Sequence, residues 1–229
     1  MASPTRGPHA TQPEPRPARP GWLERHQRYA DRAAAGPIDL LFLGDSITQR
    51  WETAPAVWQH WYAPRRAVAM GIDNDGTQQL LWRLAHSHLE LVCPRLAVVL
   101  IGINNLGNDA AEPEELTAGI LAVVADLHLR LPGTPVLLLG LLPYGATLKA
   151  GSQATIPATN RRLAALAAQA DPARLRFYDL GERFLGAGGQ VDRRLLHDGV
   201  HPSPAGYEVL AQALEPAIAA LLGPLPACP

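Results

Sequence analysis

Five short apolar runs rich in Val, Ile and Leu are spread along the chain, and most of them end at Gly or at polar residues. They are IDLLFLG (38–44), RAVAM (66–70), LAVVLIG (96–102), TPVLLLGLL (134–142) and LRFYDL (175–180). Continuous apolar runs of this length are typical of strands that are buried on both faces of a parallel sheet.

Segments with helical character separate these runs. They lie at about 51–62, 76–92, 113–131 and 157–170, with a last one from Pro204 to about Leu222. Before the first run, WLERHQRYADRAAAG predicts a helix that Gly36 closes and that Pro37 prevents from continuing. This alternation predicts a three-layer α/β/α sandwich, in which ligands bind beyond the carboxyl ends of the strands.

Composition and length indicate a single globular domain. The chain has 229 residues, of which 47% are hydrophobic and 18% charged, so it is long enough to bury a sizeable core. We assign the domain to residues 21–224. The proline-rich stretch 1–20 has no apolar centre of the kind a secretory signal needs, and we expect it to be a disordered tail, with 225–229 as a short C-terminal tail.

Charge and cysteine content exclude some classes of partner. The formal net charge of -1 gives no electrostatic case for binding nucleic acid, and no apolar run is long enough for a membrane span. The two cysteines, Cys93 and Cys228, lie far apart in the chain, so a disulfide framework is not expected. A reducing compartment, and hence a cytoplasmic location, is the simpler prediction.

The polar stretch Asp73-Asn74-Asp75-Gly76 raises three alternatives: a calcium loop, a hairpin turn or part of an active site. An EF-hand loop with Gly76 in its sixth position would place Gly71 first and Trp82 twelfth. Neither residue has a side-chain oxygen, so the calcium loop is excluded. TQQLLWRL follows as a helix rather than a returning strand, which excludes the hairpin. Asp75 and Gln78 resemble a capping box at the start of that helix.

A serine follows the first predicted strand directly. In Gly44-Asp45-Ser46 the glycine would allow a tight turn that exposes the Ser46 hydroxyl as a nucleophile. Alone, the tripeptide is weak evidence, because Asp and Ser are also common helix caps. Beyond the third strand lie Asn104 and Asn105, where an amide would be placed to stabilise an oxyanion or simply to close the strand.

A candidate general base lies near the C-terminus. Asp198 and His201 are three residues apart, which lets the carboxylate hold the imidazole in the tautomer a base needs. Ser203 and Pro204 then predict the start of the last helix. His197 is a rival base, but it directly precedes Asp198 and its side chain would more naturally point elsewhere. Together these segments supply a nucleophile, amide donors, an orienting acid and a base.

The four segments resemble those of the GDSL or SGNH hydrolase superfamily over about residues 22–222. The matching blocks are LFLGDSITQRW, GIDNDGTQQLLWRL, IGINN and DGVHPSPAGY. Within that superfamily the pattern is most similar to the platelet-activating-factor acetylhydrolase catalytic subunits and their bacterial relatives. The resemblance implies a flavodoxin-like fold with a mainly parallel five-stranded sheet. It implies no metal or organic cofactor, and because some relatives dimerise it leaves a homodimer open.

The resemblance also implies roles for individual residues. Ser46 would be the nucleophile, His201 the base and Asp198 its orienting acid, with Asn104 as a side-chain oxyanion donor beside the Ser46 N–H. One position departs from the family: the close relatives have Gly-Ile-Gly-Gly-Asp where this chain has GIDND, so Asn74 replaces a glycine whose N–H helps to form the oxyanion hole.

Asn74 keeps the backbone N–H and tolerates positive φ. If its side chain points into the hole, it would narrow the space for the acyl group, which would favour small acyl groups or abolish turnover. Asp73 adds a charge nearby, and we count it among the substrate-binding candidates together with Tyr144, in the loop from Pro143 to Gly151. Trp51, Trp58 and Trp61 are either part of the pocket wall or packed against the core.

These observations predict a serine esterase that removes a short acyl group, acetyl above all, from the oxygen of a small-molecule ester. One alternative is an acyltransferase that uses the same acyl-enzyme. Another is a non-catalytic binding or assembly protein, in which the altered second block has abolished turnover.

Overall fold

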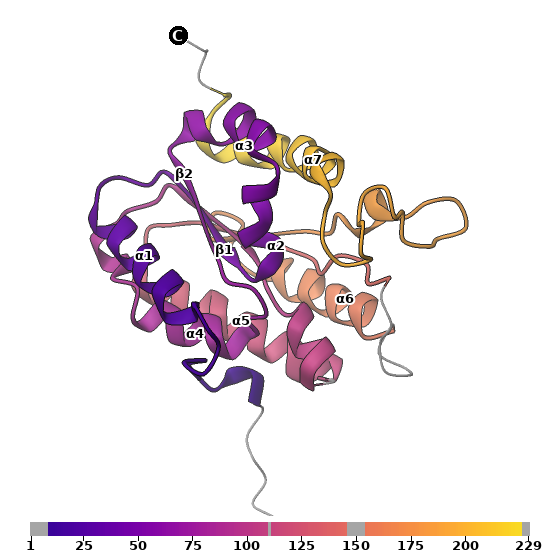
Figure 1. The fold of residues 1–229 in the computed structure, drawn as a ribbon, viewed down its shortest axis with the longest axis horizontal. Helices are drawn as coiled ribbons and strands as arrows, with labels where there is room; N and C mark the ends of the chain where they lie inside the picture. The colour runs from indigo at the N-terminus through magenta and orange to yellow at the C-terminus, as the bar shows by residue number, and fades with distance from the viewer. Residues whose placement is uncertain (1–8, 110, 146–153, 226–229) are drawn as a thin grey trace, which may run out of the picture.

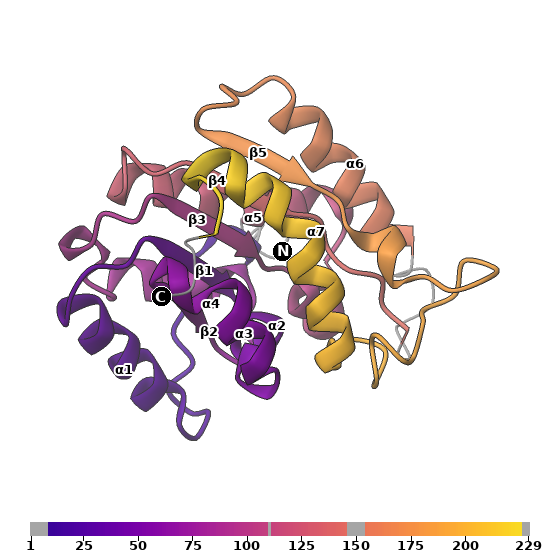
Figure 2. The same cartoon turned by 90° about the horizontal axis from the view of Figure 1, so that it is seen from above.

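The computed structural model describes residues 9–109, 111–145 and 154–225, and its centre is one five-stranded sheet (Figure 1). The strands are β1 (Leu40–Gly44), β2 (Ala67–Gly71), β3 (Leu96–Leu100), β4 (Val136–Leu139) and β5 (Leu175–Tyr178). All of them pair in parallel, in the order β2-β1-β3-β4-β5 (Figure 2). This is the flavodoxin-like order, whose switch point lies between β1 and β3, and it confirms the predicted fold class.

Helices connect the strands and cover both faces of the sheet. The α-helices are α1 (Trp22–Ala34), α2 (Ser46–Gln49), α3 (Pro55–Trp61), α4 (Thr77–Ala85), α5 (Pro113–Arg130), α6 (Thr155–Ala167) and α7 (Pro204–Leu222). Shorter 3-10 turns are η1 (His9–Thr11), η2 (Arg50–Thr53), η3 (Ala63–Arg65), η4 (Leu89–Leu91) and η7 (Gly181–Phe184), and η5 (Asn105–Asp109) is a π-helical turn.

The helices form the two outer layers of the predicted sandwich. Helices α3 and α7 pack together on one face, whereas α4, α5 and α6 pack side by side on the other (Figure 1). All residues of β1, β3 and β4 are buried, while β2 and β5, at the two edges, are partly exposed. The continuous apolar runs are therefore explained by helices on both faces.

Two predicted helices are interrupted in the structure. The segment predicted at 51–62 is divided at Ala54, because Pro55 has no N–H to continue a helix and begins α3 instead. The segment predicted at 76–92 stops after Ala85, and His88 then adopts a left-handed conformation (φ 52°) before η4. Prediction of the last helix is confirmed in detail: Ser203 caps α7, accepting a hydrogen bond from Gly206 N, and Pro204 is its first residue.

The structure differs from the predicted N-terminal tail over residues 9–20. Ala10 in η1 is buried against α5, and Thr77 donates a hydrogen bond of 2.6 Å from Oγ1 to the Ala10 carbonyl. Prolines prevent a long helix here, but an extended chain can still bond to a neighbouring element. Residues 1–8, and the end of the predicted C-terminal tail at 226–229, lie outside the described residues.

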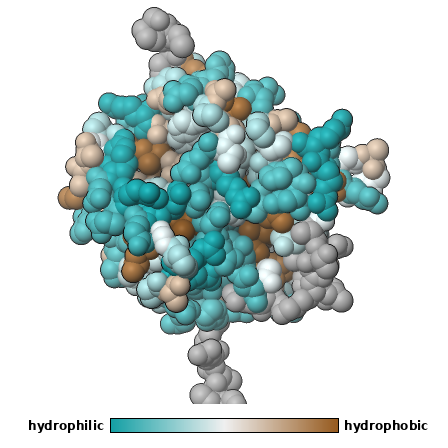
Figure 3. All heavy atoms as spheres, in the orientation of Figure 1, coloured by the Kyte–Doolittle hydropathy of each residue, from teal (hydrophilic) through white to brown (hydrophobic). Residues whose placement is uncertain are grey.

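The surface seen in Figure 3 is mainly polar, with apolar side chains in small separate patches. None of the helices in the described part of the chain is long and apolar enough to cross a bilayer. Cys93 is exposed and unpaired, and Cys228 lies outside the described residues.

Candidate functional site

Three turns meet at the carboxyl edge of the sheet because the central strands are in register. Gly71, Gly44 and Leu100 lie opposite one another at the ends of β2, β1 and β3. The turn after β2 contains residues 73–76 and is called the second-block turn below. The turn after β1 contains Ser46, and the turn after β3 contains Asn104 and Asn105. The predicted placement of functional residues just after strands is therefore what the register produces.

Ser46 is the first residue of α2 and is almost completely buried, with 4% of its surface exposed. As the first residue of a helix, it has an N–H with no acceptor inside that helix. The turn before it needs glycine for close packing rather than for its φ angle: a Cβ at Gly44 would lie 2.2 Å from the Leu100 carbonyl oxygen. The Ser46 hydroxyl therefore lies just beyond the carboxyl end of β1.

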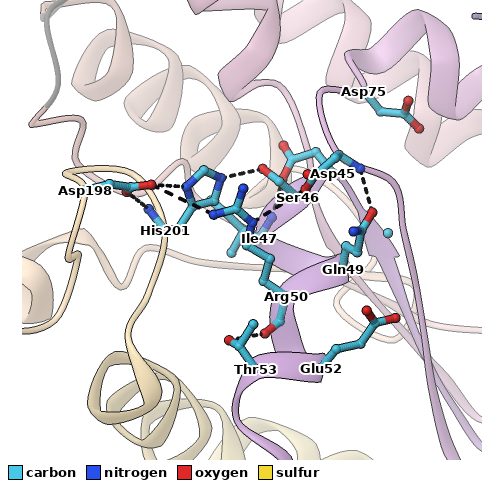
Figure 4. Close-up of polar contacts among 12 residues, drawn as sticks. Asp45, Ser46, Ile47, Gln49, Arg50, Glu52, Thr53, Asp75, Asp198 and His201 are labelled. Carbon is cyan, nitrogen blue, oxygen red and sulfur yellow. Dashed lines mark hydrogen bonds and ion pairs between the residues drawn. The ribbon is translucent and has the colours of Figure 1, made fainter. Parts of the chain in front are cut away.

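A chain of hydrogen bonds joins Asp198, His201 and Ser46 (Figure 4). His201 Nε2 lies 2.8 Å from Ser46 Oγ, and His201 Nδ1 lies 2.5 Å from Asp198 Oδ2. The other carboxylate oxygen of Asp198 accepts the N–H groups of Val200, at 2.9 Å, and of His201, at 2.8 Å. The loop backbone thus fixes the carboxylate, and the carboxylate fixes the imidazole that contacts the serine.

Asp198 is held in its ionised form. Partial burial alone would raise the pKa of this carboxyl, but the N–H groups of His201 and Val200 and the imidazole beside it lower the pKa well below the usual value. An ionised Asp198 requires a proton on His201 Nδ1 for the short hydrogen bond between them. Nε2 is then the nitrogen free to accept the Ser46 proton.

In the described part of the chain, the ring that hydrogen-bonds to Ser46 is that of His201 and not that of the rival base His197. Its side chain is 55% exposed, and Nε2 is 3.9 Å from Asp198 Oδ2, too far for a hydrogen bond. The backbone N–H of His197 donates a hydrogen bond to the His201 carbonyl. His201 is therefore the histidine placed to act on Ser46.

The two asparagines after β3 have different surroundings. Asn105 is buried, accepts the Thr77 N–H at 2.9 Å and donates to Gln78 Oε1 at 2.8 Å, so its amide is used within the start of α4. Asn104 is partly exposed and donates one N–H from Nδ2 to the Asp75 carbonyl at 2.9 Å. Since an amide nitrogen has two N–H groups, that bond orients the side chain and leaves the second N–H.

Asn74 has a left-handed conformation, which glycine adopts more easily than other residues. Its φ is 66°, and its N–H has no hydrogen-bond acceptor among the described residues. Asn tolerates this region better than most side chains, as the sequence predicts. The side-chain oxygen accepts a hydrogen bond of 3.0 Å from Asn108 Nδ2, which links this turn to η5.

Asp73 lies in the same turn and contacts residues of the Ser46 helix and its extension. Its N–H donates to Gln49 Oε1 at 2.8 Å, and its Oδ1 lies 3.6 Å from Arg50 Nε. Arg50 Nη1 in turn lies 3.9 Å from Asp198 Oδ2 (Figure 4). The Arg50 guanidinium therefore contacts two carboxylates, those of Asp73 and Asp198. Arg50 is not predicted from the sequence, in which its one signal is its position one helical turn after Ser46.

A buried ion pair between Asp75 and Arg83 holds the second-block turn. Asp75 is fully buried and accepts hydrogen bonds of 2.7 Å from both Arg83 Nε and Trp22 Nε1. Arg83 also donates to the carbonyls at the ends of two strands, Met70 of β2 and Gly44 of β1. Asp75 therefore does not cap α4 as predicted.

Helix α4 is capped one residue later than predicted. Gly76 is the residue before the helix, and its N–H donates to Gln79 Oε1 at 2.9 Å. The predicted partner, Gln78, instead accepts the Asn105 amide. Of the two hydrogen bonds of a capping box, the chain forms the one from the Gly76 N–H to the Gln79 side chain.

Asp45 is a second buried carboxyl beside the serine. Its Oδ1 accepts the Ile47 N–H at 2.9 Å, while Oδ2 has no hydrogen-bond partner among the described residues. Burial, reinforced by the nearby charges of Asp75 and Asp73 and opposed by the Ile47 N–H and Arg83, raises the pKa of Asp45 to about 7. Asp45 is therefore protonated over much of the mildly acidic range.

Tyr144 lies in the wall of a cavity of about 600 Å³ that none of Ser46, Asp198 and His201 lines. The next residue, Gly145, donates its N–H to the Gly199 carbonyl at 2.7 Å, and Gly199 belongs to the turn between Asp198 and His201. Polar side chains in the same wall include Asp179 and Arg193. The rest of the predicted loop, from 146 to 151, lies outside the described residues.

The three tryptophans in the segment after Ser46 pack against other elements. Trp51 is 4% exposed and its ring contacts Tyr207 of α7, with centroids 4.4 Å apart. Trp58 packs against Phe42 of the sheet, and Trp61 donates its ring N–H to Glu208. The packing alternative therefore describes this group. Among the residues that the structure describes, no three His, Cys, Asp or Glu side chains are grouped so that they could hold a metal ion.

Comparison with known families decides how this arrangement is classified. The GDSL-like Lipase/Acylhydrolase family matches residues 42–209, which include all of the turns described above. The chain belongs to this family. Subunit alpha1 of the human platelet-activating factor acetylhydrolase IB is 32% identical over 203 residues, which cover 88% of this chain and 84% of that protein. Membership of this acylhydrolase family makes the chain a carboxylic ester hydrolase.

Solved structures share the fold at lower sequence identity. A GDSL-like lipase from Bacteroides thetaiotaomicron superposes with a TM-score of 0.73 at 23% identity, covering 86% of this chain and 98% of that one. A carbohydrate esterase family 3 protein from Talaromyces cellulolyticus gives a TM-score of 0.64 at 18% identity, covering 80% and 97% of the two chains. Both confirm the α/β architecture of this GDSL family member.

Proposed function

We propose that this hydrolase removes short acyl groups, acetyl above all, from the oxygen of small-molecule esters, through an acyl-enzyme on Ser46. The observation that carries the proposal is the pair of hydrogen bonds from Asp198 to His201, at 2.5 Å, and from His201 to Ser46, at 2.8 Å. A serine hydroxyl in contact with an oriented imidazole has the arrangement that nucleophilic acyl transfer needs.

The first half of the proposed reaction forms the ester on the enzyme. Ser46 Oγ attacks the carbonyl carbon while its proton passes to His201 Nε2, giving a tetrahedral intermediate. The ionised Asp198 stabilises the imidazolium that results. The proton then passes from His201 to the alcohol oxygen as the bond between that oxygen and the carbonyl carbon breaks.

In the second half, water takes the place of the alcohol. The water oxygen attacks the acyl carbon while a proton of the water passes to His201. The bond between Ser46 Oγ and the acyl carbon then breaks, His201 returns a proton to Ser46 Oγ, and the carboxylic acid leaves. The oxyanion of each intermediate is bound by three donors: the N–H of Ser46, the N–H of Asn74 and the second N–H of Asn104. Donors that are fixed before reaction stabilise developing charge without the cost of reorganisation.

Preference for acetyl is supported by the second-block turn and by the relatives. The Asn74 side chain, held by Asn108, occupies space that a glycine would leave open. The human relative is named an acetylhydrolase. For the alcohol, Asp179, Glu182 and Arg193 in the wall that Tyr144 shares would be available to a hydroxyl-rich or charged group, and we keep Tyr144 and Asp73 as candidate substrate contacts.

The test compares p-nitrophenyl esters of increasing acyl length, hydrolysed by the unaltered chain and by Ser46→Ala. We expect the highest kcat/KM for the acetyl ester and a loss on the order of 1000-fold or more in Ser46→Ala, since removing the nucleophile of such a triad abolishes most of the rate enhancement. Equal hydrolysis by both proteins, or none by either, would sink the proposal and favour a non-catalytic role. An added alcohol that diverts the acyl group from water would reveal the acyltransferase alternative.

A further inference from the structure

The N-terminal segment 9–20 lies against the turn that holds Asn74. Its contacts are spread along its length: Thr77 Oγ1 donates to the Ala10 carbonyl, and Glu14 N donates to the Gln78 carbonyl at 3.0 Å. Thr77 and Gln78 are the first two residues of α4, and this helix directly follows the turn that contains Asn74.

Arg16 reaches furthest into this turn. Its Nη1 donates to the Asn74 carbonyl, and its Nη2 donates to Gln79 Oε1 at 3.3 Å. The same Gln79 oxygen accepts the Gly76 N–H, so one guanidinium is connected to both ends of the stretch from Asn74 to Gly76. The Arg16 side chain is partly buried by these contacts.

The conformation of Asn74 needs such support. A non-glycine residue with φ near 66° is less stable in that region than in the right-handed one. Rotation of the backbone at Asn74 would move its N–H as well as its carbonyl. A charge-assisted hydrogen bond to that carbonyl is stronger than a neutral one and opposes this rotation.

We propose that Arg16 is a positioning residue of the esterase site: by holding the Asn74 carbonyl it keeps the Asn74 N–H directed at the developing oxyanion. This inference rests on the proposed function, because the oxyanion exists only if Ser46 attacks an ester. It assigns part of the catalytic geometry to a segment whose composition predicts disorder.

The decisive experiment measures kcat and KM for p-nitrophenyl acetate, together with Tm, in the full chain. Arg16→Ala is expected to lower kcat on the order of 10-fold with little change in KM, because losing a whole oxyanion donor costs on the order of 100- to 1000-fold. Arg16→Lys, which restores one charged donor, should recover most of the rate. Millimolar guanidinium should partly rescue Arg16→Ala.

Two control variants separate positioning from simple attachment of the segment. Thr77→Val removes the hydrogen bond to Ala10 without touching Arg16, and Arg66→Ala removes an exposed ion pair with Asp39 at the far end of β1. Both should keep kcat. A loss in Thr77→Val equal to that in Arg16→Ala, or an unchanged kcat in Arg16→Ala with only a lower Tm, would overturn the inference.

The same measurements distinguish this inference from the proposed function. If the unaltered chain shows no Ser46-dependent hydrolysis, the proposed function fails and the role of Arg16 fails with it. If the unaltered chain is active and Arg16→Ala is equally active, only the role of Arg16 fails. Arg16→Gln, which keeps a neutral donor, replaces Arg16→Ala in the comparison should the latter not fold.

Discussion

At the scale of single residues, neighbouring side chains of one type differ in what they contact. Asn104 and Asn105 are adjacent in the chain, yet one amide faces the turn beside Ser46 and the other is buried under the start of α4. His197 and His201 differ in the same way. Residue type therefore suggests the chemistry, and only the surroundings decide which copy performs it.

The asparagine pair gives a matched prediction. Asn104→Ala should lower kcat on acetyl esters on the order of 100- to 1000-fold, because it removes an oxyanion donor, and should leave Tm nearly unchanged. Asn105→Ala should instead destabilise the fold by roughly 1–3 kcal/mol, since it leaves the buried Thr77 N–H without an acceptor. Steady-state kinetics and thermal unfolding of both variants check this, and the opposite assignment of effects would refute it.

Asn74→Gly tests whether crowding sets acyl length. Glycine adopts φ near 66° without strain, so hydrolysis of the acetyl ester should persist. The ratio of kcat/KM for butyryl over acetyl esters should rise on the order of 10-fold, the effect expected for a methylene or two in a pocket. Asn108→Ala, which removes the partner of the Asn74 side chain, is the control. An unchanged chain-length profile in Asn74→Gly would count against crowding.

At the scale of elements, the site depends on contacts between turns and helices that are distant in sequence. The Asp75–Arg83–Trp22 contacts join α1, α4 and the ends of β1 and β2. Arg16 and Arg50 add further contacts to the second-block turn. The three turns around Ser46 are thus held by side chains from elements on either side.

Arg83→Met should be strongly destabilising. Removing one partner of a buried ion pair leaves an uncompensated charge and costs roughly 3–5 kcal/mol in the free energy of unfolding. Arg66→Met removes an exposed pair with Asp39 and should change that free energy by less than about 1 kcal/mol. Urea unfolding of both proteins measures the difference. Similar values for the two would show that the buried pair is not important for stability.

The sequence predicts the strands and the layers of the sandwich from the apolar runs. It predicts Ser46 and Asn104 from their positions just after such runs, and Asp198 and His201 from their spacing just before the last helix. It does not predict Arg16 or Arg50 as site residues. Arg16 bonds to a residue 58 positions away, and no local pattern encodes such a contact. The break at Pro55 and the cap at Gly76 are not predicted either, because each lies in a run whose other residues have helical character.

At the scale of the whole molecule, the buried charges beside the site make stability depend on pH. Asp45 has a pKa of about 7 in the folded chain against an ordinary value of 3.8. Between these values the folded state holds a proton that the unfolded state has released, so this group's contribution to stability falls as pH rises through the window and is constant above it.

The cytoplasmic location and the homodimer stay predictions from the sequence.

Asp45→Asn isolates this effect. Asn still accepts the Ile47 N–H but cannot ionise. The stability of the unaltered chain relative to Asp45→Asn should therefore decrease from about pH 4 to about pH 7 by a few kcal/mol, at roughly 1.4 kcal/mol for each unit of pKa shift. Chemical unfolding at several pH values measures it. A difference that is constant with pH would show that Asp45 is ionised throughout.

The most direct measurement of the central claim is the acyl-enzyme itself. The protein is mixed with p-nitrophenyl acetate and quenched in acid within milliseconds, and its peptides are analysed by mass spectrometry. The account predicts an acetyl group on Ser46, formed as fast as p-nitrophenol is first released and absent from Ser46→Ala. Undiminished hydrolysis by Ser46→Ala, with no acetyl group ever found on Ser46 of the unaltered chain, would contradict it.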